Sequence, residues 1–300
     1  MGSLGRYLAE EIAVDHADGL LNRREALRRL GLLGVTGVAA STLLAACGGG
    51  AKDGSGSAAA STGGGPPAGP TPRPVVPVSY PDPTGTMLNG AWSEPEAEPL
   101  GGVLVIHENK GLTDHIRSVA GRFAASGYAA LAPDLLSREG GTAAIGDPAK
   151  VTATLGTVAP ARLVADLRSA LAELSVRVEA RKLGTVGFCF GGGLVWRLLA
   201  AGEPKLSAAV PFYGPLPDKP DFSRSGAAVL AVYAESDARV NASRDAAEAA
   251  LTAAGLPHDV VTYPGVDHAF FNDTGPRYNA EAAADAYQRV LNWFERYVAT

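Results

Sequence analysis

The stretch Lys182-Leu-Gly-Thr-Val-Gly-Phe-Cys-Phe-Gly-Gly-Gly-Leu-Val-Trp196 decides the fold, because it predicts a strand, a sharp turn and a helix in that order. The turn contains Gly187-Phe188-Cys189-Phe190-Gly191, a nucleophile-elbow pattern with cysteine in the position of serine. Side chains two positions from the centre of such a turn would collide with its strained backbone, which explains the flanking glycines. We therefore expect the thiol at the carboxyl end of a strand, beside a helix N-terminus that favours negative charge.

The pentapeptide alone also fits a small buried cysteine between a closely packed strand and helix. The composition leaves room for either interpretation, since 300 residues with 46% hydrophobic content can form one sizeable core with further segments left over. A net charge of -5, with no basic cluster outside the N-terminal region, argues against a nucleic-acid partner. The two cysteines, Cys47 and Cys189, lie in such different contexts that we expect no disulfide.

Residues 1–47 have the three parts of an export signal. A basic segment, 22–29, precedes the uncharged apolar run 30–46, which is shorter than the roughly 20 residues that span a membrane. Arg23-Arg24 resembles a twin-arginine signal, although Ala26 is a weak residue for that motif. Leu44-Ala45-Ala46-Cys47 resembles a bacterial lipobox, in which the cysteine is lipidated and becomes the new N-terminus. We expect an exported protein, lipid-anchored at Cys47 on the outer face of a membrane of the bacterial envelope; a single-span anchor is the alternative.

Two further regions follow the signal. Residues 48–77 consist mainly of Gly, Ser, Ala, Thr and Pro, so we expect a disordered tether. Residues 78–300 form the predicted globular domain, in which strand and helix patterns alternate. That alternation predicts a doubly wound, mostly parallel α/β sheet with helices on both faces and ligands bound beyond the carboxyl ends of its strands. The predicted strands are 102–106, 128–132, 183–186, 208–212, 228–233 and 259–263, and the predicted helices are 114–126, 162–177, 241–254 and 278–297.

Candidate catalytic residues follow several of these strands. A nucleophilic thiol needs a base and a third group that orients the base. Cys189, Asp237 and His268 occur in the nucleophile–acid–histidine order of α/β-hydrolases, and each follows a predicted strand. Asp237 is alternatively a turn or helix cap, and Asp267 is a rival orienting group. We expect His115 and His258 at the surface, and no ligand set with recognisable spacing predicts a metal around His107-Glu108.

The region from about residue 81 to 297 resembles the dienelactone hydrolases, also called carboxymethylenebutenolidases. Four stretches carry the resemblance: 105–112, 128–136, 187–192 and 263–270. The resemblance implies an α/β-hydrolase fold, a Cys189–His268–Asp237 triad and an active-site glutamate, Glu108, that helps to generate the thiolate. It also implies an oxyanion hole formed by the backbone N–H groups of Asn109 and Phe190. No cofactor is implied, and the substrate would be a small ester or lactone.

The resemblance leaves several points open. Dienelactone hydrolases bind a substrate carboxylate with arginines, for which Arg277 and Arg138 are candidates, and an exported protein departs from a cytoplasmic degradative enzyme. Two other functions fit the elbow: a glutamine-amidotransferase-like or chaperone-like protein, and a surface lipoprotein that binds without catalysis. The exact substrate and the oligomeric state are not predicted.

Overall fold

The computed structural model describes residues 2–35, 37–48, 65–179 and 181–299, and the side chains of Cys47 and Gly48 lie outside that description. An eight-stranded sheet forms its centre, with strand order β1-β2-β4-β3-β5-β6-β7-β8. β2 pairs antiparallel with β1 and β4, and the other pairs are parallel. The strands are β1 (Val76–Pro81), β2 (Met87–Ser93), β3 (Gly102–Ile106), β4 (Ala129–Pro133), β5 (Leu183–Phe188), β6 (Leu206–Phe212), β7 (Ala228–Ala234) and β8 (His258–Tyr263).

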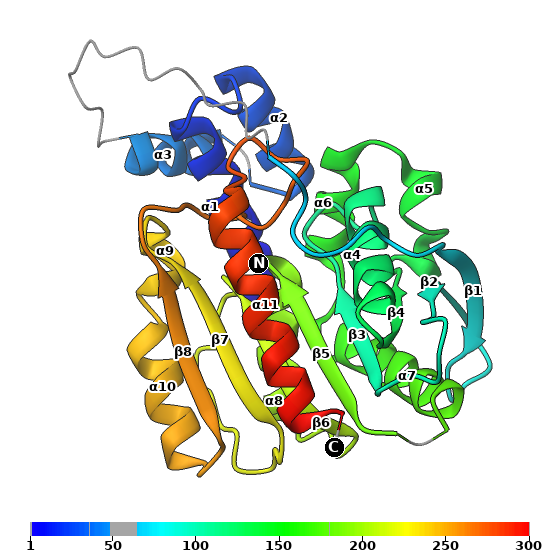
Figure 1. Cartoon of the computed structure of the whole chain (residues 1–300). Helices are drawn as coiled ribbons and strands as arrows, with labels where there is room; N and C mark the ends of the chain where they lie inside the picture. Colours follow the sequence, from blue (N-terminus) through cyan, green and yellow to red (C-terminus); the bar gives the residue numbers. More distant parts are fainter. Residues whose placement is uncertain (1, 36, 49–64, 180, 300) are drawn as a thin grey trace.

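Helices cover both faces of the sheet, which explains why β3, β4, β5 and β7 are buried along their whole length. In Figure 1, α4 and α11 lie in front of the sheet, while α7 and α8 pack behind it. Between β4 and α7 the chain makes an excursion that consists of a 3-10 turn, the short helix α5 and helix α6. The helices of this domain are α4 (Asp114–Ala125), α5 (Thr142–Ile145), α6 (Pro148–Thr157), α7 (Pro160–Arg177), α8 (Phe190–Ala201), α9 (Ala238–Asn241), α10 (Arg244–Ala253) and α11 (Ala280–Tyr297), with a 3-10 turn at Ser137–Glu139.

The strand order determines where a site can form. The chain leaves β3 through α4 to β4 on one side, and then returns through α7 to β5 on the other side of β3. The carboxyl ends of β3 and β5 are therefore neighbours at the point where the winding reverses, and ligands of such sheets bind there. Glu108 follows β3 and Cys189 follows β5, so the topology brings both to this crevice.

The α/β-hydrolase architecture expected from the sequence is confirmed, and the predicted strands agree with the observed ones within about two residues. Three details differ. The antiparallel β1–β2 pair was not predicted, because short edge strands give a weak periodic pattern. The helix predicted over 241–254 begins three residues later, as α10, and a separate short helix that was not predicted, α9, precedes it. The domain begins before the predicted position of residue 78: Ala68 is buried, and the guanidinium of Arg122 donates a hydrogen bond to its carbonyl. Most of the predicted tether, 49–64, lies outside the described residues.

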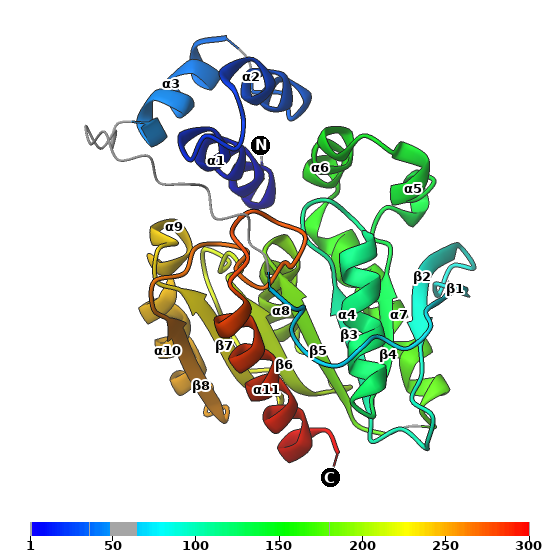
Figure 2. The same cartoon turned by 45° about the horizontal axis from the view of Figure 1, so that its top comes forward.

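Three helices precede the domain and form what we call the N-terminal unit, residues 3–48. They are α1 (Ser3–Ala17), α2 (Arg23–Leu32) and α3 (Gly37–Gly48). Figure 2 shows them above the end of the sheet at which α9 and α6 also lie. Among the described residues no helix combines the length and apolar character needed to cross a membrane. The sequence-based expectation of an export signal covers this same segment and stays a prediction.

Candidate active site

Cys189 occupies a strained turn between β5 and α8. Its backbone has φ 56° and ψ -118°, a conformation that non-glycine residues rarely adopt. The glycines around it are required by close backbone approach: a Cβ on Gly187 would lie 2.4 Å from the carbonyl oxygen of Gly191, and a Cβ on Gly191 would lie 2.4 Å from that of Ile106. The elbow predicted from the sequence is therefore present, and the thiol is only 3% exposed.

His268 and Asp237 meet beside this turn. His268 Nδ1 lies 2.5 Å from Asp237 Oδ2, and both side chains are buried. The other carboxylate oxygen of Asp237 accepts the backbone N–H of Val240 at 3.2 Å, so Asp237 also caps α9. Asp237 thus contacts the imidazole and caps α9 at the same time. Asp267, the rival, turns away and accepts the backbone N–H of His268.

Strained backbone is concentrated around this pair. Apart from Glu179, the described non-glycine residues with positive φ are Cys189, Tyr213 and Ala269. Tyr213 ends β6 and its ring centroid lies 4.8 Å from that of His268, while Ala269 directly follows the histidine. Such strain persists where the surrounding fold over-determines a conformation, which is common at functional sites.

Glu108 and Asn109 line the same cavity as Cys189, which has a volume of about 300 Å³. Glu108 is buried, and its Oε2 accepts a hydrogen bond from Asn272 Nδ2 at 2.6 Å. Phe190 is the first residue of α8, where backbone N–H groups lack helical partners. The preceding His107 is a structural residue: its Nδ1 lies 2.7 Å from the Glu108 carbonyl, its Nε2 accepts the N–H of Leu135, and burial lowers its pKa.

Helix α1 of the N-terminal unit reaches into this site. The hydroxyl of Tyr7 lies 3.3 Å from Cys189 Sγ and 3.4 Å from His268 Nε2, and so contacts both the thiol and the imidazole. Glu11 Oε1 lies 3.3 Å from the same His268 Nε2. Both α1 side chains are at most 6% exposed. The imidazole is therefore flanked by a carboxylate on each nitrogen.

The charges of the site are strongly coupled. Burial alone would lower the pKa of His268, but Glu11, Cys189 and Asp237 together raise it well above the ordinary value. Burial likewise opposes ionisation of Asp237 and Glu11, yet the imidazole lowers the pKa of each carboxyl. These interactions favour the imidazolium form of His268 and the ionised forms of both carboxyls.

One group among the described residues could hold a metal ion, and it is this same cluster. Glu11, Cys189 and His268 each offer one ligand atom, and these atoms lie within 4.8 Å of one another. A structural zinc site takes four protein ligands. The imidazole of His268 is already committed to Asp237 through Nδ1, which leaves Nε2 as its ligand atom. The cluster thus depends on Glu11 of the N-terminal unit as much as on the elbow.

Three sequence-based expectations about other residues need correction or refinement. His115 is not at the surface: it is 4% exposed and its Nδ1 lies 2.7 Å from Asp273 Oδ1. Arg138 is not beside the elbow, because it pairs with Asp82 and Asp166 next to β1 and α7. The position of Arg138 in the sequence could not reveal that Asp82 and Asp166 hold its side chain away from the elbow.

Arg277 does line the cavity, but its guanidinium is engaged with α1. Nη1 lies 3.0 Å from Asp15 Oδ1 and Nη2 lies 2.5 Å from Asp18 Oδ2. The sequence reasoning missed Tyr7 and Glu11, since residues 1–47 were assigned to export, and it also missed Arg239 of α9, whose partner Glu11 lies in that segment. A usable signal existed, because Leu4, Tyr7, Leu8 and Glu11 recur at the spacing of one helix face.

Comparison with known proteins matches the region of the chain that contains the site. The model of the dienelactone hydrolase family matches residues 88–298, which include every strand from β3 to β8 together with Glu108, Cys189, Asp237 and His268. The chain belongs to the dienelactone hydrolase family. This membership identifies it as a hydrolase of esters or lactones.

Relatives of this dienelactone hydrolase family member cover most of its domain. A protein of Methylorubrum extorquens named "Putative carboxymethylenebutenolidase" is 35% identical over 216 residues, 67% of this chain and 74% of its own length. A crystal structure titled "Putative Dienelactone Hydrolase", from Klebsiella pneumoniae, superposes with a TM-score of 0.66 at 31% identity, covering 75% of this chain and 100% of that chain. A dienelactone hydrolase-like promiscuous phosphotriesterase from metagenomic libraries gives 0.63 at 26% identity, covering 75% and 98%.

Proposed function

We propose that this family member cleaves an ester or lactone through a Cys189–His268–Asp237 triad. The thiolate attacks the substrate carbonyl carbon, a C–S bond forms, and the charge on oxygen is held by the N–H groups of Phe190 and Asn109. The C–O bond then breaks, and the leaving oxygen takes the proton of the His268 imidazolium. Water next attacks the thioester, His268 accepts its proton, and the thiolate leaves with release of the carboxylic acid. The reaction needs no cofactor.

The observation that carries this proposal is the convergence of three strand ends on one buried cluster. β5 supplies the strained Cys189, β7 supplies Asp237, and the loop after β8 supplies His268 with Nδ1 bonded to Asp237. Glu108, after β3, faces the same cavity. We assign Glu108 an assisting role in forming the thiolate, since a carboxylate beside a thiol can accept or redirect its proton.

The test is hydrolysis of p-nitrophenyl acetate and a panel of lactones. Because α1 lies against Cys189, the assay uses the full chain with a protease recognition sequence placed within residues 49–64. We call this protein the cleavable chain, and its activity is measured before and after cleavage. Cys189→Ala removes the nucleophile, and we expect hydrolysis to fall to the uncatalysed rate with little change in the thermal midpoint. Activity in that variant equal to the parent would refute the triad. Thiol alkylation of the parent should give the same loss.

We also propose that the protein is exported and lipid-anchored through Cys47. The support is the sequence 44–47 together with the preceding basic and apolar segments. Cys47→Ser should yield a protein without lipid that leaves the membrane fraction, as measured by fractionation and mass spectrometry. Membrane association unchanged by this substitution would indicate an uncleaved anchor instead. A glutamine-amidotransferase-like activity or a purely binding role gains no support from the described geometry.

A further inference from the structure

One face of α1 is built to fit the mouth of the active site. Leu4, Tyr7, Leu8 and Glu11 follow the i, i+3, i+4, i+7 spacing of a single helix face. Leu4, Tyr7 and Leu8 join the hydrophobic core of the domain, and all three are at most 5% exposed. The hydroxyl of Tyr7 at the centre of this face contacts both Cys189 Sγ and His268 Nε2. The docked helix therefore covers the thiol, which is only 3% exposed.

The opposite face of α1 belongs to the N-terminal unit. Ala9, Ile12 and Ala13 form a second, separate cluster with Ala26 and Leu30 of α2 and with residues of α3. α1 therefore lies between two cores, one in the N-terminal unit and one in the domain. The N-terminal unit can consequently carry α1 with it as one body when it moves.

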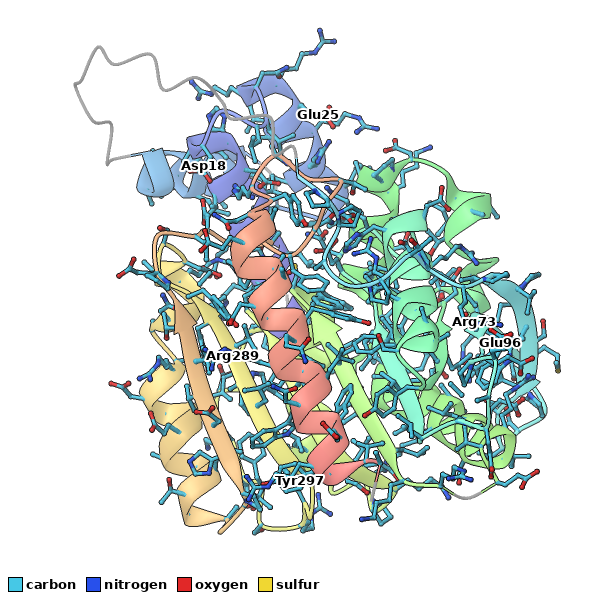
Figure 3. The ribbon with its side chains drawn as sticks, viewed as in Figure 1. Asp18, Glu25, Arg73, Glu96, Arg289 and Tyr297 are labelled. Atoms are coloured by element: carbon cyan, nitrogen blue, oxygen red, sulfur yellow. The ribbon has the colours of Figure 1, made fainter. Side chains whose placement is uncertain are left out.

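Charge complementarity fixes the position of α1. Glu11 pairs with Arg239, whose guanidinium carbon also lies 4.3 Å from the centroid of the Tyr7 ring. Asp15 and Asp18, further along the helix, pair with Arg277 at 3.0 and 2.5 Å. An acidic edge of α1 is thus matched to two arginines of the domain that flank the catalytic cluster. Figure 3 shows Asp18 on the N-terminal unit, at the opposite end of the molecule from Tyr297.

Two further contacts hold the N-terminal unit beside α6. Arg28 of α2 pairs with Asp147 at 2.6 Å, directly before α6. A Cβ on Gly156 of α6 would lie 2.6 Å from Leu33 Cδ2, so this glycine permits the close approach of the segment after α2. The walls of the cavity beside Cys189 accordingly come from both bodies: Glu11, Asp15, Leu20, Leu21 and Arg29 face Glu108, Asn109 and His268.

We propose that the N-terminal unit is an intramolecular inhibitor that occupies the active site, and that cutting the chain between this unit and the domain relieves the inhibition. The inference rests on the proposed function, since it concerns the same site. While the two bodies are joined, the linker keeps the unit at an effective concentration of about millimolar order, which favours docking. After a cut the unit is a free peptide, and dilution removes it. The export processing proposed at Cys47 would make a nearly equivalent cut: cleavage directly before Cys47, in the last turn of α3, would separate residues 1–46 from the domain, so that hydrolysis would begin only after export.

The test uses the cleavable chain in a Cys47→Ser background, so that Cys189 is its one thiol. After cleavage, the N-terminal peptide is removed by gel filtration in 1 M salt, which screens exposed ion pairs. Two rates are then compared between the intact chain and the separated domain. One is ester hydrolysis, and the other is the rate at which iodoacetamide alkylates Cys189. If the docked form makes up about 90% of the intact chain, both rates rise about tenfold on removal.

The outcomes separate this inference from the proposed function. Alkylation that accelerates without any ester hydrolysis would support the inhibitor and refute the hydrolytic triad. Hydrolysis present at equal rates before and after removal, with equal alkylation, would overturn the inhibitor and leave the triad standing. A loss of activity on removal would also overturn it, because α1 would then contribute to the site.

Point variants test the same contact without cleavage. In the intact chain, Tyr7→Ala combined with Glu11→Arg removes the hydroxyl and places a positive charge against Arg239, so alkylation of Cys189 should accelerate severalfold. Glu10→Arg is the matched control, since Glu10 lies on the same helix but its side chain makes no hydrogen bond or ion pair with the described residues. Acceleration by the control equal to that of the double variant would contradict the docking geometry. An unaltered rate in the double variant would contradict it as well.

Discussion

The substitution Gly191→Ala tests the reasoning about the elbow most directly. A Cβ at this position would lie 2.4 Å from the carbonyl oxygen of Ile106 and 2.6 Å from that of His107. Ordinary contact begins near 3.4 Å, so one side must move by about 1 Å. The obstructing atoms are backbone atoms at the end of β3, which is paired on both sides by β4 and β5 and cannot yield easily.

The expected loss of stability follows from two opposing terms. Alanine in a helix is about 1 kcal/mol more favourable than glycine. Overpacking typically costs about 1–3 kcal/mol and occasionally more; against backbone we take a cost of about 2–4 kcal/mol, which leaves a net loss of about 1–3 kcal/mol. For a domain of this size each kcal/mol lowers the thermal midpoint by about 2–4 °C, so the midpoint should fall by roughly 2–12 °C. A shift of Cys189 by about 1 Å should lower kcat/KM by about a hundredfold.

Thermal unfolding and ester hydrolysis of the cleaved chain measure both effects. Gly226→Ala is the matched control: Gly226 is exposed, has no positive φ, and a Cβ there would meet nothing within 4 Å. The control should change the midpoint by less than about 2 °C and leave kcat/KM unchanged. Equal midpoints and equal activities in the two variants would refute the claim that close backbone contact at the elbow requires glycine.

Three further predictions concern buried and exposed charges. In the intact chain, Glu11→Gln should lower the pKa of His268, read from ring resonances by NMR, because the imidazolium loses a carboxylate; the adjacent Glu10→Gln should not. Folding raises the pKa of His268, so the protonated imidazole stabilises the folded protein fully below about pH 6.5, and this stabilisation is lost as the pH rises through the folded pKa. In urea unfolding at a series of pH values, Glu11→Gln should shift this loss to lower pH. Arg122→Met leaves the buried carboxylate of Asp273 without its arginine partner, and should lower the free energy of unfolding, measured with urea, by about 3 kcal/mol. Arg138→Met, remote from the elbow, should leave kcat/KM within about twofold of the parent.

Much of the domain was predictable because its sequence signals are local. Continuous apolar runs of five to seven residues identify parallel strands buried on both faces, and the glycines of 187–193 identify a turn in which backbones touch. Positions at strand ends are read from the same runs, so Glu108, Cys189, Asp237 and His268 could be named before their distances were known. Parallel strands bring their carboxyl ends together, which makes sequence order a guide to spatial grouping.

Other features depend on which distant surfaces meet, and no local pattern encodes that. Arg138 and Arg277 are both plausible ligands for a carboxylate in the sequence, yet one pairs with Asp82 and Asp166 far from the elbow and the other faces α1. His115 reads as a surface histidine because its helix is amphipathic, whereas Asp273, 158 residues later, gives it a buried partner.

The sequence by itself determined the doubly wound α/β sheet, the elbow and the identities of the residues at the strand ends, because strand periodicity and turn chemistry act over a few residues; its resemblance to dienelactone hydrolases implied the α/β-hydrolase fold. Only the tertiary structure decided the surroundings of Cys189. Tyr7 and Glu11 reach the thiol and the imidazole from more than 180 residues away in the chain. Their position depends on matching an acidic helix edge to Arg239 and Arg277, and such complementarity exists only after the sheet has brought α9 and the loop before α11 together.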